Sequence, residues 1–577
     1  MINIKENENL NVLNHSCAHL LAQAVKHLYP HAMFWVGPVI EEGFYYDIDL
    51  GDDVIREEDL EKIEKEMKKI SKDGKRIVRS ELSREEALDM FKDDPYKLDL
   101  INNMDNDAVI SAYSQGDFTD LCRGPHVETV KMLKNFKLLK VSGAYWKGDA
   151  NNKMLQRIYG ICFETAEDLS NHLELLEEAK RRDHRKLGRE LELFMFCEYG
   201  PGFPFWLPKG MILRNILENF WYDEHTKEGY QFIKTPIMLN RDLWEVSGHW
   251  NNYKENMYTS TIDEKEFAIK PMNCPGGLLV YKNKLHSYKD LPERVGELGL
   301  VHRHEASGAL NGLFRVRNFT QDDAHIFMTE DQIESEIIRL INFIDRVYKM
   351  FNLPYTIELS TRPLDKYIGS IDIWNKAEAA LESACMKAGK ECVVNPGDGA
   401  FYGPKLDFHV KDSLGRVWQC GTIQLDFNLP ERFDCSYVAS DGTKKRPVML
   451  HRVIFGSVER FIGIITEHFA GAFPLWLSPV QVNIIPVKNE YHLEYCENLK
   501  KMLIESGIRV ELDVREEKLG YRMRESQTKK NPYTLVIGDK EVEGNLVNYR
   551  RHGSTDTNVV SVQEFIDLLK EQINNYK

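Results

Sequence analysis

Apolar and charged positions alternate with a period of two between residues 301 and 327, most clearly at Phe314 and Val316, which stand among arginines. A Ser-Gly-Ala-Leu-Asn-Gly segment divides this stretch. The pattern predicts two antiparallel strands joined by a loop, each with one charged face. The arginines concerned are Arg303, Arg315 and Arg317. Their planar guanidinium groups suit the oxygens of a polyphosphate, but a solvated, salt-bridged hairpin fits the charge pattern equally well.

Other alternating segments predict further strands. Residues 401–409 and 417–427 are expected to be adjoining strands of the same antiparallel sheet. From about Val480 the pattern changes. Three short apolar strands, at residues 480–486, 509–513 and 533–538, then alternate with a helix over residues 491–506. Strands that alternate with helices indicate an α/β domain with a largely parallel sheet.

Helical periodicity predicts four helices elsewhere. One starts with Asn14 as its cap and places His15 and His19 on one face. A second covers residues 165–187 with a stripe of leucines, and a third covers residues 211–227, before a strand that ends at Thr235-Pro236. The apolar run 461–477 is predicted to be a core helix and not a membrane span, because Glu467 and His468 interrupt it.

Composition narrows the class of protein. A chain of 577 residues should hold three or four domains, and its formal net charge of −15 argues against wholesale coating of a polyanion, although local basic patches can still bind nucleic acid. The ten cysteines form no Cys-x-x-Cys pair, which favours a reduced compartment. The polar start is unlike a signal peptide. We therefore expect a soluble cytoplasmic protein without a membrane segment.

His15, His19, Cys122 and His126 have the residue types of a zinc site, because imidazole and thiolate are the ligands that zinc prefers. Isolated polar residues near a core explain them as well, since His-x-x-x-His on a helix is a common coincidence. Cys274, His325 and His451 lie far apart along the chain, so their spacing carries no metal signal.

Longer motifs add a resemblance. Arg303-His-Glu305, a loop and then Phe319 resemble motif 2 of class II aminoacyl-tRNA synthetases, and the string from Arg315 to Phe327, Arg-Val-Arg-Asn-Phe-Thr-Gln-Asp-Asp-Ala-His-Ile-Phe, is similar to that of threonyl-tRNA synthetases. His451-Arg-Val-Ile-Phe-Gly-Ser-Val-Glu-Arg460 resembles motif 3. The resemblance implies an α+β catalytic domain with an antiparallel sheet, which activates threonine with ATP and attaches it to tRNA(Thr).

The resemblance also implies roles for individual residues. Arg303 would bind the α-phosphate of ATP, Arg315 the outer phosphates and Glu305 the adenine amino group, while Phe319 and Arg460 enclose the ring; Arg303, Arg315 and Arg460 form the catalytic set. Gln419 and Thr422 would lie near the nucleotide, although outward-facing polar alternation explains them too. Magnesium is expected with ATP. Threonine would contact Met272, Gln321, Asp323, Tyr402 and Gln424, and one zinc ion per subunit would bind Cys274, His325 and His451.

Such a site would discriminate against valine more strongly than against serine. Zinc and Asp323 would be left unsatisfied by valine, which lacks the hydroxyl, and sites built to bond a hydroxyl reject its absence by about 10⁴–10⁵-fold. Serine keeps the hydroxyl and lacks one methyl, which is worth only roughly 1–3 kcal/mol. Activation chemistry of this kind therefore predicts a second, hydrolytic site.

The amino-terminal third contains a candidate for that second site. His15-Ser-Cys-Ala-His19-Leu-Leu, Cys122-Arg-Gly-Pro-His126 and Ser142-Gly-Ala-Tyr-Trp-Lys-Gly-Asp149 resemble the α+β editing domain of bacterial threonyl-tRNA synthetases, where seryl-tRNA is hydrolysed. His15, His19, Lys97, Asp120, Cys122 and His126 would form the site. We expect this site to hydrolyse its substrate without a metal ion, and a zinc site formed by the same residues is the alternative. Only thirteen residues precede Asn14, so the small module often found ahead of this domain is expected to be missing.

The carboxy-terminal part resembles an anticodon-binding domain, in which Glu516, Glu541 and Arg550 match base-reading positions; Glu516 replaces a relative's asparagine. Residues 200–236 resemble motif 1, which implies a homodimer. The expected domains are 1–164 for editing, 165–189 for a linker helix, 190–478 for catalysis and 479–577 for the anticodon. Gly277, His304 and Ala306 depart from common family residues.

Two other interpretations are weighed against the synthetase. A catalytically silent tRNA-binding paralogue would not need the motif arginines and the three zinc ligands that this chain retains. A zinc hydrolase centred on His15, His19, Cys122 and His126 would leave motifs 1 to 3 unexplained.

Overall fold

The computed structural model describes residues 2–365 and 367–577. The chain divides into two compact units, Met1–Glu178 and Ala179–Lys577, and each is described by itself. Helix α5 (Ala166–Arg182) spans this division along the chain. Among the described residues, no helix has both the length and the apolar run that a membrane crossing needs.

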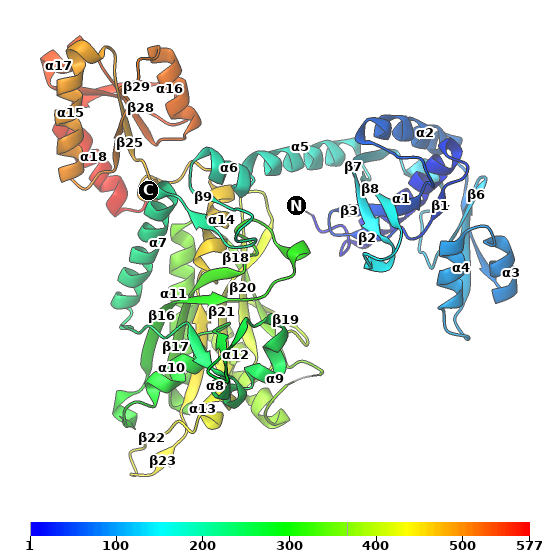
Figure 1. The fold of residues 1–577 in the computed structure, drawn as a ribbon, viewed down its shortest axis with the longest axis horizontal. Helices are drawn as coiled ribbons and strands as arrows, with labels where there is room; N and C mark the ends of the chain where they lie inside the picture. Colours follow the sequence, from blue (N-terminus) through cyan, green and yellow to red (C-terminus); the bar gives the residue numbers. More distant parts are fainter. Residues whose placement is uncertain (1, 366) are drawn as a thin grey trace. The chain divides into compact units, whose positions relative to one another are not determined.

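The first unit contains two antiparallel sheets. In the larger one the strand order is β1 (Met33–Phe34), β3 (Gly43–Asp49), β8 (Met154–Phe163) and β7 (Asn135–Tyr145), with β2 (Val39–Ile40) beside β3. Helices α1 (Glu8–Leu28) and α2 (Leu60–Asp73) pack on it and on each other (Figure 1). The smaller sheet joins β4 (Ile77–Leu82), β5 (Ile110–Gln115) and β6 (Phe118–Leu121), with α3 (Arg84–Met90) and α4 (Pro95–Asn102) between β4 and β5 along the chain. This arrangement confirms the predicted α+β class.

The predicted start of α1 is wrong. The helix begins at Glu8, and the cap is Asn7, whose side chain accepts a hydrogen bond from the Leu10 N–H. Asn14 lies inside the helix and is fully buried. Its amide group bonds both the N–H and the carbonyl of Cys162 on β8, at 2.9 Å each. A polar side chain can be buried here because its hydrogen bonds are satisfied, and these bonds fix the helix to the sheet.

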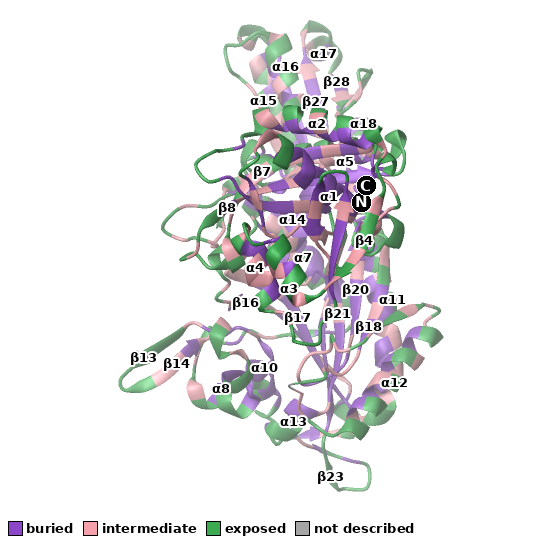
Figure 2. Cartoon of the chain, turned by 90° about the vertical axis from the view of Figure 1, so that its right-hand side faces the viewer, coloured by how far each residue is buried: buried purple, intermediate pink, exposed green. Residues whose placement is uncertain are grey.

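The second unit is built around an eight-stranded sheet in the order β11-β16-β17-β24-β21-β20-β18-β19. The strands are β11 (Gln231–Phe232), β16 (Glu293–His302), β17 (Asn318–Met328), β24 (Val448–Val453), β21 (Val417–Asp426), β20 (Lys405–Lys411), β18 (Tyr355–Ser360) and β19 (Cys392–Asn395). Only the two edge pairs are parallel, so the predicted antiparallel sheet is confirmed. Figure 2 shows the central strands β17, β20 and β21 largely buried.

Helices of the same hydrophobic core as this sheet include α7 (Pro208–Lys227), α11 (Ile333–Met350), α12 (Ile371–Lys387) and α14 (Val458–His468). Helix α11 shows why they pack there. Its apolar residues recur every three to four positions, as at Ile337, Leu340, Ile341 and Ile344, and all four are buried. Packing of such a stripe, more than helix propensity, stabilises a helix of this length.

The stretch around residues 301–327 matches its prediction in part. Strands β16 and β17 pair antiparallel from Glu293↔Phe327 to His302↔Asn318. However, Phe314 and Val316 lie in the loop and not on a strand. The N–H groups of Phe314 and Arg315 donate back to Asn311 O, at 2.9 and 3.3 Å, around Gly312 with φ +49°. Local turn bonds therefore replace the strand ladder there.

Two helix predictions need correction. The expected helix 165–187 is two helices, because Asp183 interrupts it and caps α6 (His184–Glu190) through a 2.8 Å bond from the Arg185 N–H. The expected helix 461–477 ends at His468, where Ala470 and Gly471 turn into the left-handed region. Cys274 begins helix α10 (Cys274–Tyr281).

The last part of the second unit is an α/β layer with its own core. Its sheet runs β26 (Val510–Leu512), β25 (Val482–Pro486), β27 (Tyr533–Ile537), β28 (Leu546–Arg551) and β29 (Thr557–Ser561). The first three strands are parallel, as predicted, and the last two are antiparallel. The helices are α15 (Asn489–Glu505), α16 (Leu519–Thr528), α17 (Asp539–Gly544) and α18 (Val562–Asn574).

Candidate functional site

A cavity of about 280 Å³ opens between β17, β21 and the start of α14. Its lining includes every residue that the sequence proposed for nucleotide contact: Arg303, Glu305, Arg315, Phe319, Gln419, Thr422 and Arg460. These residues come from three separate segments of the chain. The sheet register brings them together, because β17 pairs with β16 and β24, and β24 pairs with β21.

The two arginines on the motif 2 side differ in how firmly they are placed. Arg303 donates through Nε to Pro271 O at 3.2 Å, and its guanidinium lies 5.1 Å from the ring centroid of Phe319. Arg315 is 57% exposed, and its Nε is 3.8 Å from a carboxylate oxygen of Glu305. The side chain of Arg303 is therefore held in place within the cavity, whereas the position of Arg315 depends on the conformation of its loop.

Buried polar bonds join the strand of motif 2 to the turn of motif 3. Asp322 accepts three backbone N–H groups, from Ile454, Phe455 and Gly456, at 2.8–2.9 Å. Gly456 has φ +82°, and a Cβ there would stand 2.8 Å from Cys420 O. Only glycine accommodates this close approach, which leaves the turn directly beside the cavity.

A second cavity, of about 300 Å³, adjoins the first and shares Arg303, Gln321 and Thr422 with it. Its lining includes the five residues proposed for threonine contact: Met272, Gln321, Asp323, Tyr402 and Gln424. The Asn273 amide donates to Asp323 at 3.2 Å. Burial raises the pKa of Asp323, although the hydrogen bond from Asn273 and the charges of Arg452 and Lys270 oppose the rise.

Two of the three proposed zinc ligands, Cys274 and His451, line this second cavity, and the ring of His325 lies 5.1 Å from that of His451. His451 bonds Asp426 through Nε2 at 2.9 Å, which leaves its other nitrogen free for the cavity. His325 Nε2 is buried without a hydrogen bond to any described residue. Burial lowers the pKa of His325 and raises that of the Cys274 thiol.

The donor atoms of the three proposed zinc ligands, Cys274, His325 and His451, do not all lie close to one another in this structure. In the described part of the chain, two groups of His, Cys, Asp and Glu have donor atoms that all lie within 4.8 Å of one another, and this triad is not one of them. The first group is His15, His19, Cys122 and His126; the second is Asp183, His184 and Glu467.

The sequence missed His249, Lys405 and Asp407, which lie beside these cavities. His249 is fully buried, with Nε2 at 3.1 Å from Met272 Sδ and 4.0 Å from Cys274 Sγ, and burial lowers its pKa to about 3. Lys405 lines the second cavity and forms an ion pair with Asp407, which also accepts from Gln419 and Thr422 at 2.6 and 2.9 Å. No periodicity marks these residues, because only the folded sheet places them there.

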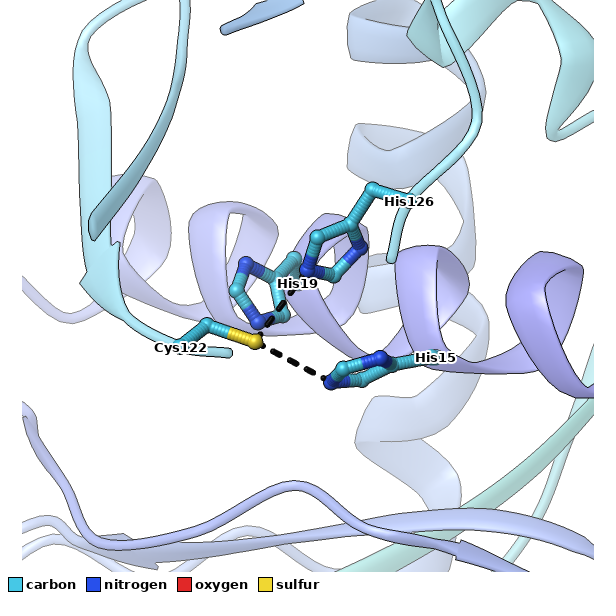
Figure 3. Close-up of side chains that lie close together, drawn as sticks. All are labelled: His15, His19, Cys122 and His126. Carbon is cyan, nitrogen blue, oxygen red and sulfur yellow. Dashed lines mark hydrogen bonds between the residues drawn. The ribbon is translucent and has the colours of Figure 1, made fainter. Parts of the chain in front are cut away.

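In the first unit, α1 presents His15 and His19 toward Cys122 and His126 (Figure 3). Cys122 Sγ lies 3.2 Å from Nε2 of both His15 and His126. Cys122 and His126 belong to the segment that follows β6, far along the sequence from α1. The proposed cluster is therefore brought together by the fold.

Lys97 and Asp120 complete the cluster as a buried ion pair of 2.6 Å. Asp120 also accepts from Tyr46 and lies 3.6 Å from His19. Burial alone would raise the pKa of Asp120, but the charge of Lys97 and the hydrogen bonds from Lys97 and Tyr46 bring it below its ordinary value. Burial lowers the pKa of His15 and of His126, lowers that of His19 to about 4, and raises that of Cys122 to about 11. The site is thus a set of neutral imidazoles and a thiol beside a fixed charge pair.

The three proposed anticodon residues lie apart in their domain. Glu516 is exposed before α16, Glu541 lies in α17 and Arg550 on β28. The Glu541 carboxylate already accepts the Gly538 N–H at 2.9 Å. No hydrogen bond or ion pair between described residues connects the three.

Comparison with known families agrees with this architecture. Residues 258–469 match the family described as tRNA synthetase class II core domain (G, H, P, S and T), residues 481–572 match the anticodon binding domain, and residues 110–159 match the threonyl and alanyl tRNA synthetase second additional domain. Together, the antiparallel core, its nucleotide cavity and these domains define a class II aminoacyl-tRNA synthetase.

Individual relatives identify the family. The chain is 58% identical to the threonine–tRNA ligase of Acetivibrio thermocellus over 97% of its own length and 88% of the relative's, and 59% identical to that of Fusobacterium nucleatum over 98% and 91%. A structure titled as the RNA binding domain of threonyl-tRNA synthetase from Cryptosporidium parvum has 41% identity and a TM-score of 0.66, and covers 68% of this chain and 98% of its own. The chain belongs to the threonine–tRNA ligase family.

Proposed function

We propose that this protein activates threonine with ATP, attaches it to tRNA(Thr), and hydrolyses seryl-tRNA(Thr) at a separate site. The observation that carries the proposal is the pair of adjoining cavities. One is lined by the aromatic ring and arginines that suit a nucleotide, and the other by the polar groups that suit a small hydroxyl amino acid. Shared residues place the two reactants side by side, as in-line attack on a phosphate requires.

In the first step the threonine carboxylate attacks the α-phosphorus of ATP, and pyrophosphate leaves. Arg303, at the junction of the cavities, is positioned to neutralise charge on the α-phosphate. Arg315 reaches the outer phosphates, and Mg²⁺ accompanies them. Phe319 and Arg460 enclose the adenine, and Glu305 accepts from its amino group. The chain contributes mainly orientation and charge.

Zinc fits the second cavity. Cysteine with two histidines is a donor set that zinc prefers. His325 has a buried ring nitrogen without a hydrogen bond to any described residue, 3.8 Å from a carboxylate oxygen of Asp323, and Asp426 orients His451 through its other nitrogen. A bound zinc ion would supply a Lewis-acidic position for the amino nitrogen and hydroxyl of threonine. Asp323 accepts from the same hydroxyl, and Gln321 and Tyr402 contact the amino group. Valine lacks the hydroxyl and leaves Asp323 unpaired.

Serine satisfies those polar groups, which is why a hydrolytic site is needed. In the first unit, water attacks the ester carbonyl of seryl-tRNA, and the bond to the terminal ribose breaks. A neutral imidazole of the cluster takes the proton of water and returns it to the ribose oxygen. The Lys97–Asp120 pair provides fixed charge beside it. We propose this step without a metal ion.

Several features of the assembly belong to the same proposal. Helix α7 and strand β11 carry exposed apolar residues such as Tyr222 and Phe232, which favours a homodimer through this face. Glu516, Glu541 and Arg550 read anticodon bases, and the protein acts in the cytoplasm. The functional divisions are 1–164, 165–189, 190–478 and 479–577.

The deciding experiment measures ATP–pyrophosphate exchange with threonine, serine and valine, together with the zinc content of the purified protein. We expect strong exchange with threonine, weaker exchange with serine, none above background with valine, and about one zinc per chain. A protein that binds tRNA(Thr) but shows no amino-acid-dependent exchange would instead be the silent paralogue. Hydrolysis that chelators abolish and ATP does not affect would point to a zinc hydrolase.

A further inference from the structure

His184 is buried between the loop that lines the nucleotide cavity and the end of α14, and it lines neither cavity itself. It starts α6 and is 1% exposed. Its ring bonds two elements at once. Nδ1 lies 2.7 Å from a carboxylate oxygen of Glu467, near the end of α14, and Nε2 lies 2.9 Å from the N–H of Leu313, in the loop that carries Arg315.

These two bonds require one form of the ring. A carboxylate can only accept, so Nδ1 carries the hydrogen, and a backbone N–H can only donate, so Nε2 carries the lone pair. Histidine in its neutral Nδ1–H tautomer satisfies both. Protonation at Nε2 would replace the acceptor by a second donor facing the Leu313 N–H.

The carboxylate partner is itself fixed. Glu467 is 3% exposed, accepts the backbone N–H of His184 at 2.9 Å, and forms an ion pair with Arg416 at 2.5 Å. Glu467 therefore gives the ring a rigid reference point on α14, the helix that also contains Arg460.

The loop is shaped around the same ring. Gly312 has φ +49°, and a Cβ there would stand 2.1 Å from His184 Nε2. The Phe314 ring lies 4.0 Å from the His184 ring and 4.4 Å from that of Trp418. Three consecutive loop residues thus contact or adjoin the imidazole immediately before Arg315, whose own side chain is mostly exposed.

We propose that His184 is a positioning residue for the nucleotide, which acts by holding the backbone that presents Arg315 to the outer phosphates of ATP. The inference rests on the proposed nucleotide role of Arg315. His184, which lies outside motifs 1 to 3, would thereby contribute to the activation of threonine. This contribution depends on the hydrogen-bond acceptor at Nε2.

Two matched pairs of variants test it. The asparagine of H184N keeps an amide donor near the position of Nδ1, but it is too short to supply an acceptor at the position of Nε2. The longer glutamine of H184Q can place an amide oxygen near the position of Nε2. G312A puts a methyl against the ring in a left-handed backbone conformation, whereas G308A, in the same loop, has no heavy atom within 4 Å of the added Cβ and no positive φ.

In threonine-dependent ATP–pyrophosphate exchange, H184N and G312A should raise the KM for ATP by roughly five- to tenfold, the loss expected for one hydrogen bond of about 1 kcal/mol or slightly more. The KM for threonine should stay within about twofold, because the second cavity includes no residue of this loop. H184Q should recover most of the ATP affinity, and G308A should match the wild type. Equal changes in both KM values, or an unchanged KM for ATP in H184N, would overturn the proposal.

Hydrogen exchange separates this inference from the proposed function. The amide of Leu313 should exchange faster in H184N and G312A than in H184Q and G308A, whether or not the protein is a synthetase. Equal protection in all four would refute the anchoring even if threonine activation is intact. If the wild type shows no exchange of pyrophosphate, the proposed function fails, and with it the role assigned to His184.

Discussion

Cys122 and its neighbouring histidines show how burial sets the form of single side chains. The three imidazoles are shielded from water, and desolvation disfavours their charged forms. Each is therefore neutral at pH 7 and able to take a proton. The Lys97–Asp120 pair keeps its charges in the same site because the partners lie 2.6 Å apart. Burial thus keeps the three imidazoles unprotonated, and the ion pair keeps a fixed dipole beside them.

This effect predicts the acidic limb of the editing reaction. A base works only when unprotonated, and because the pKa of His15 is lowered below 6.5, its unprotonated form persists to lower pH. The acidic limb of kcat/KM for deacylation of seryl-tRNA should therefore have its midpoint at a pH below 6.5. A pH profile from 4.5 to 8 measures it. An inflection at or above pH 6.5 would show that an unshifted group controls the reaction.

The position of Asp323 in the second cavity predicts that this residue contributes to amino-acid selectivity. In D323A the hydroxyl of threonine loses a charged acceptor, which is worth about 1.5–3 kcal/mol, so kcat/KM for threonine should fall roughly tenfold to a hundredfold. Valine has no hydroxyl, and its slow activation should change little. Exchange assays with both amino acids give the ratio, and a parallel loss for both would mean that Asp323 acts only on the fold.

At the scale of elements, three pieces meet at Arg214. This residue of α7 donates to Glu459 on α14 at 2.6 Å and to Thr320 on β17 at 2.7 Å, and Glu459 accepts the Thr320 N–H at 2.8 Å. Glu459 is 1% exposed. The neighbours of these residues along the chain, Arg460 and Gln321, line the nucleotide cavity. A motif 1 helix thus fixes the spacing between motifs 2 and 3.

Breaking this junction should be costly. R214M removes the charge that opposes Glu459, and leaving one partner of a buried pair costs roughly 3–5 kcal/mol. Thermal unfolding should show a clear loss of stability in the second unit. E218A is the matched control, because Glu218 bonds the same arginine from a more exposed position and should cost about 1 kcal/mol or less. Similar shifts for both variants would contradict the junction.

At the scale of the whole molecule, the two proposed reactions lie in different units of the chain. The nucleotide and amino-acid cavities belong to Ala179–Lys577, and the histidine cluster to Met1–Glu178. Each unit has its own hydrophobic core, so a change at one site need not disturb the other.

Separate units predict separable activities. H15A should leave threonine-dependent exchange and threonylation within about twofold of wild type, because His15 lies outside the catalytic core. Seryl-tRNA(Thr) should accumulate, since the cluster loses an imidazole that contacts Cys122. Charging assays with each amino acid test this, and an equal loss of threonylation and deacylation would count against two independent sites.

Motifs in the sequence were enough to predict the antiparallel catalytic sheet and the α/β end of the chain, and the residues proposed for each cavity come together in the structure. Boundaries were less predictable. Asn14 has the residue type of a cap, yet it lies inside α1, because partners on β8 satisfy its amide. Phe314 and Val316 alternate like a strand, but the bonds of Phe314 and Arg315 to Asn311 O form a turn.

The sequence by itself determined the kinds of groups available: the arginines, the cysteine and histidine donors, and the alternating strands that place them on particular faces. Only the tertiary structure decided which groups meet. His249 and His184 carry no local signal, because their partners Met272 and Leu313 are far away in the sequence and are brought close only by the packing of the folded chain. The tertiary structure also decided the protonation states of the buried side chains, because burial and charged neighbours exist only after folding.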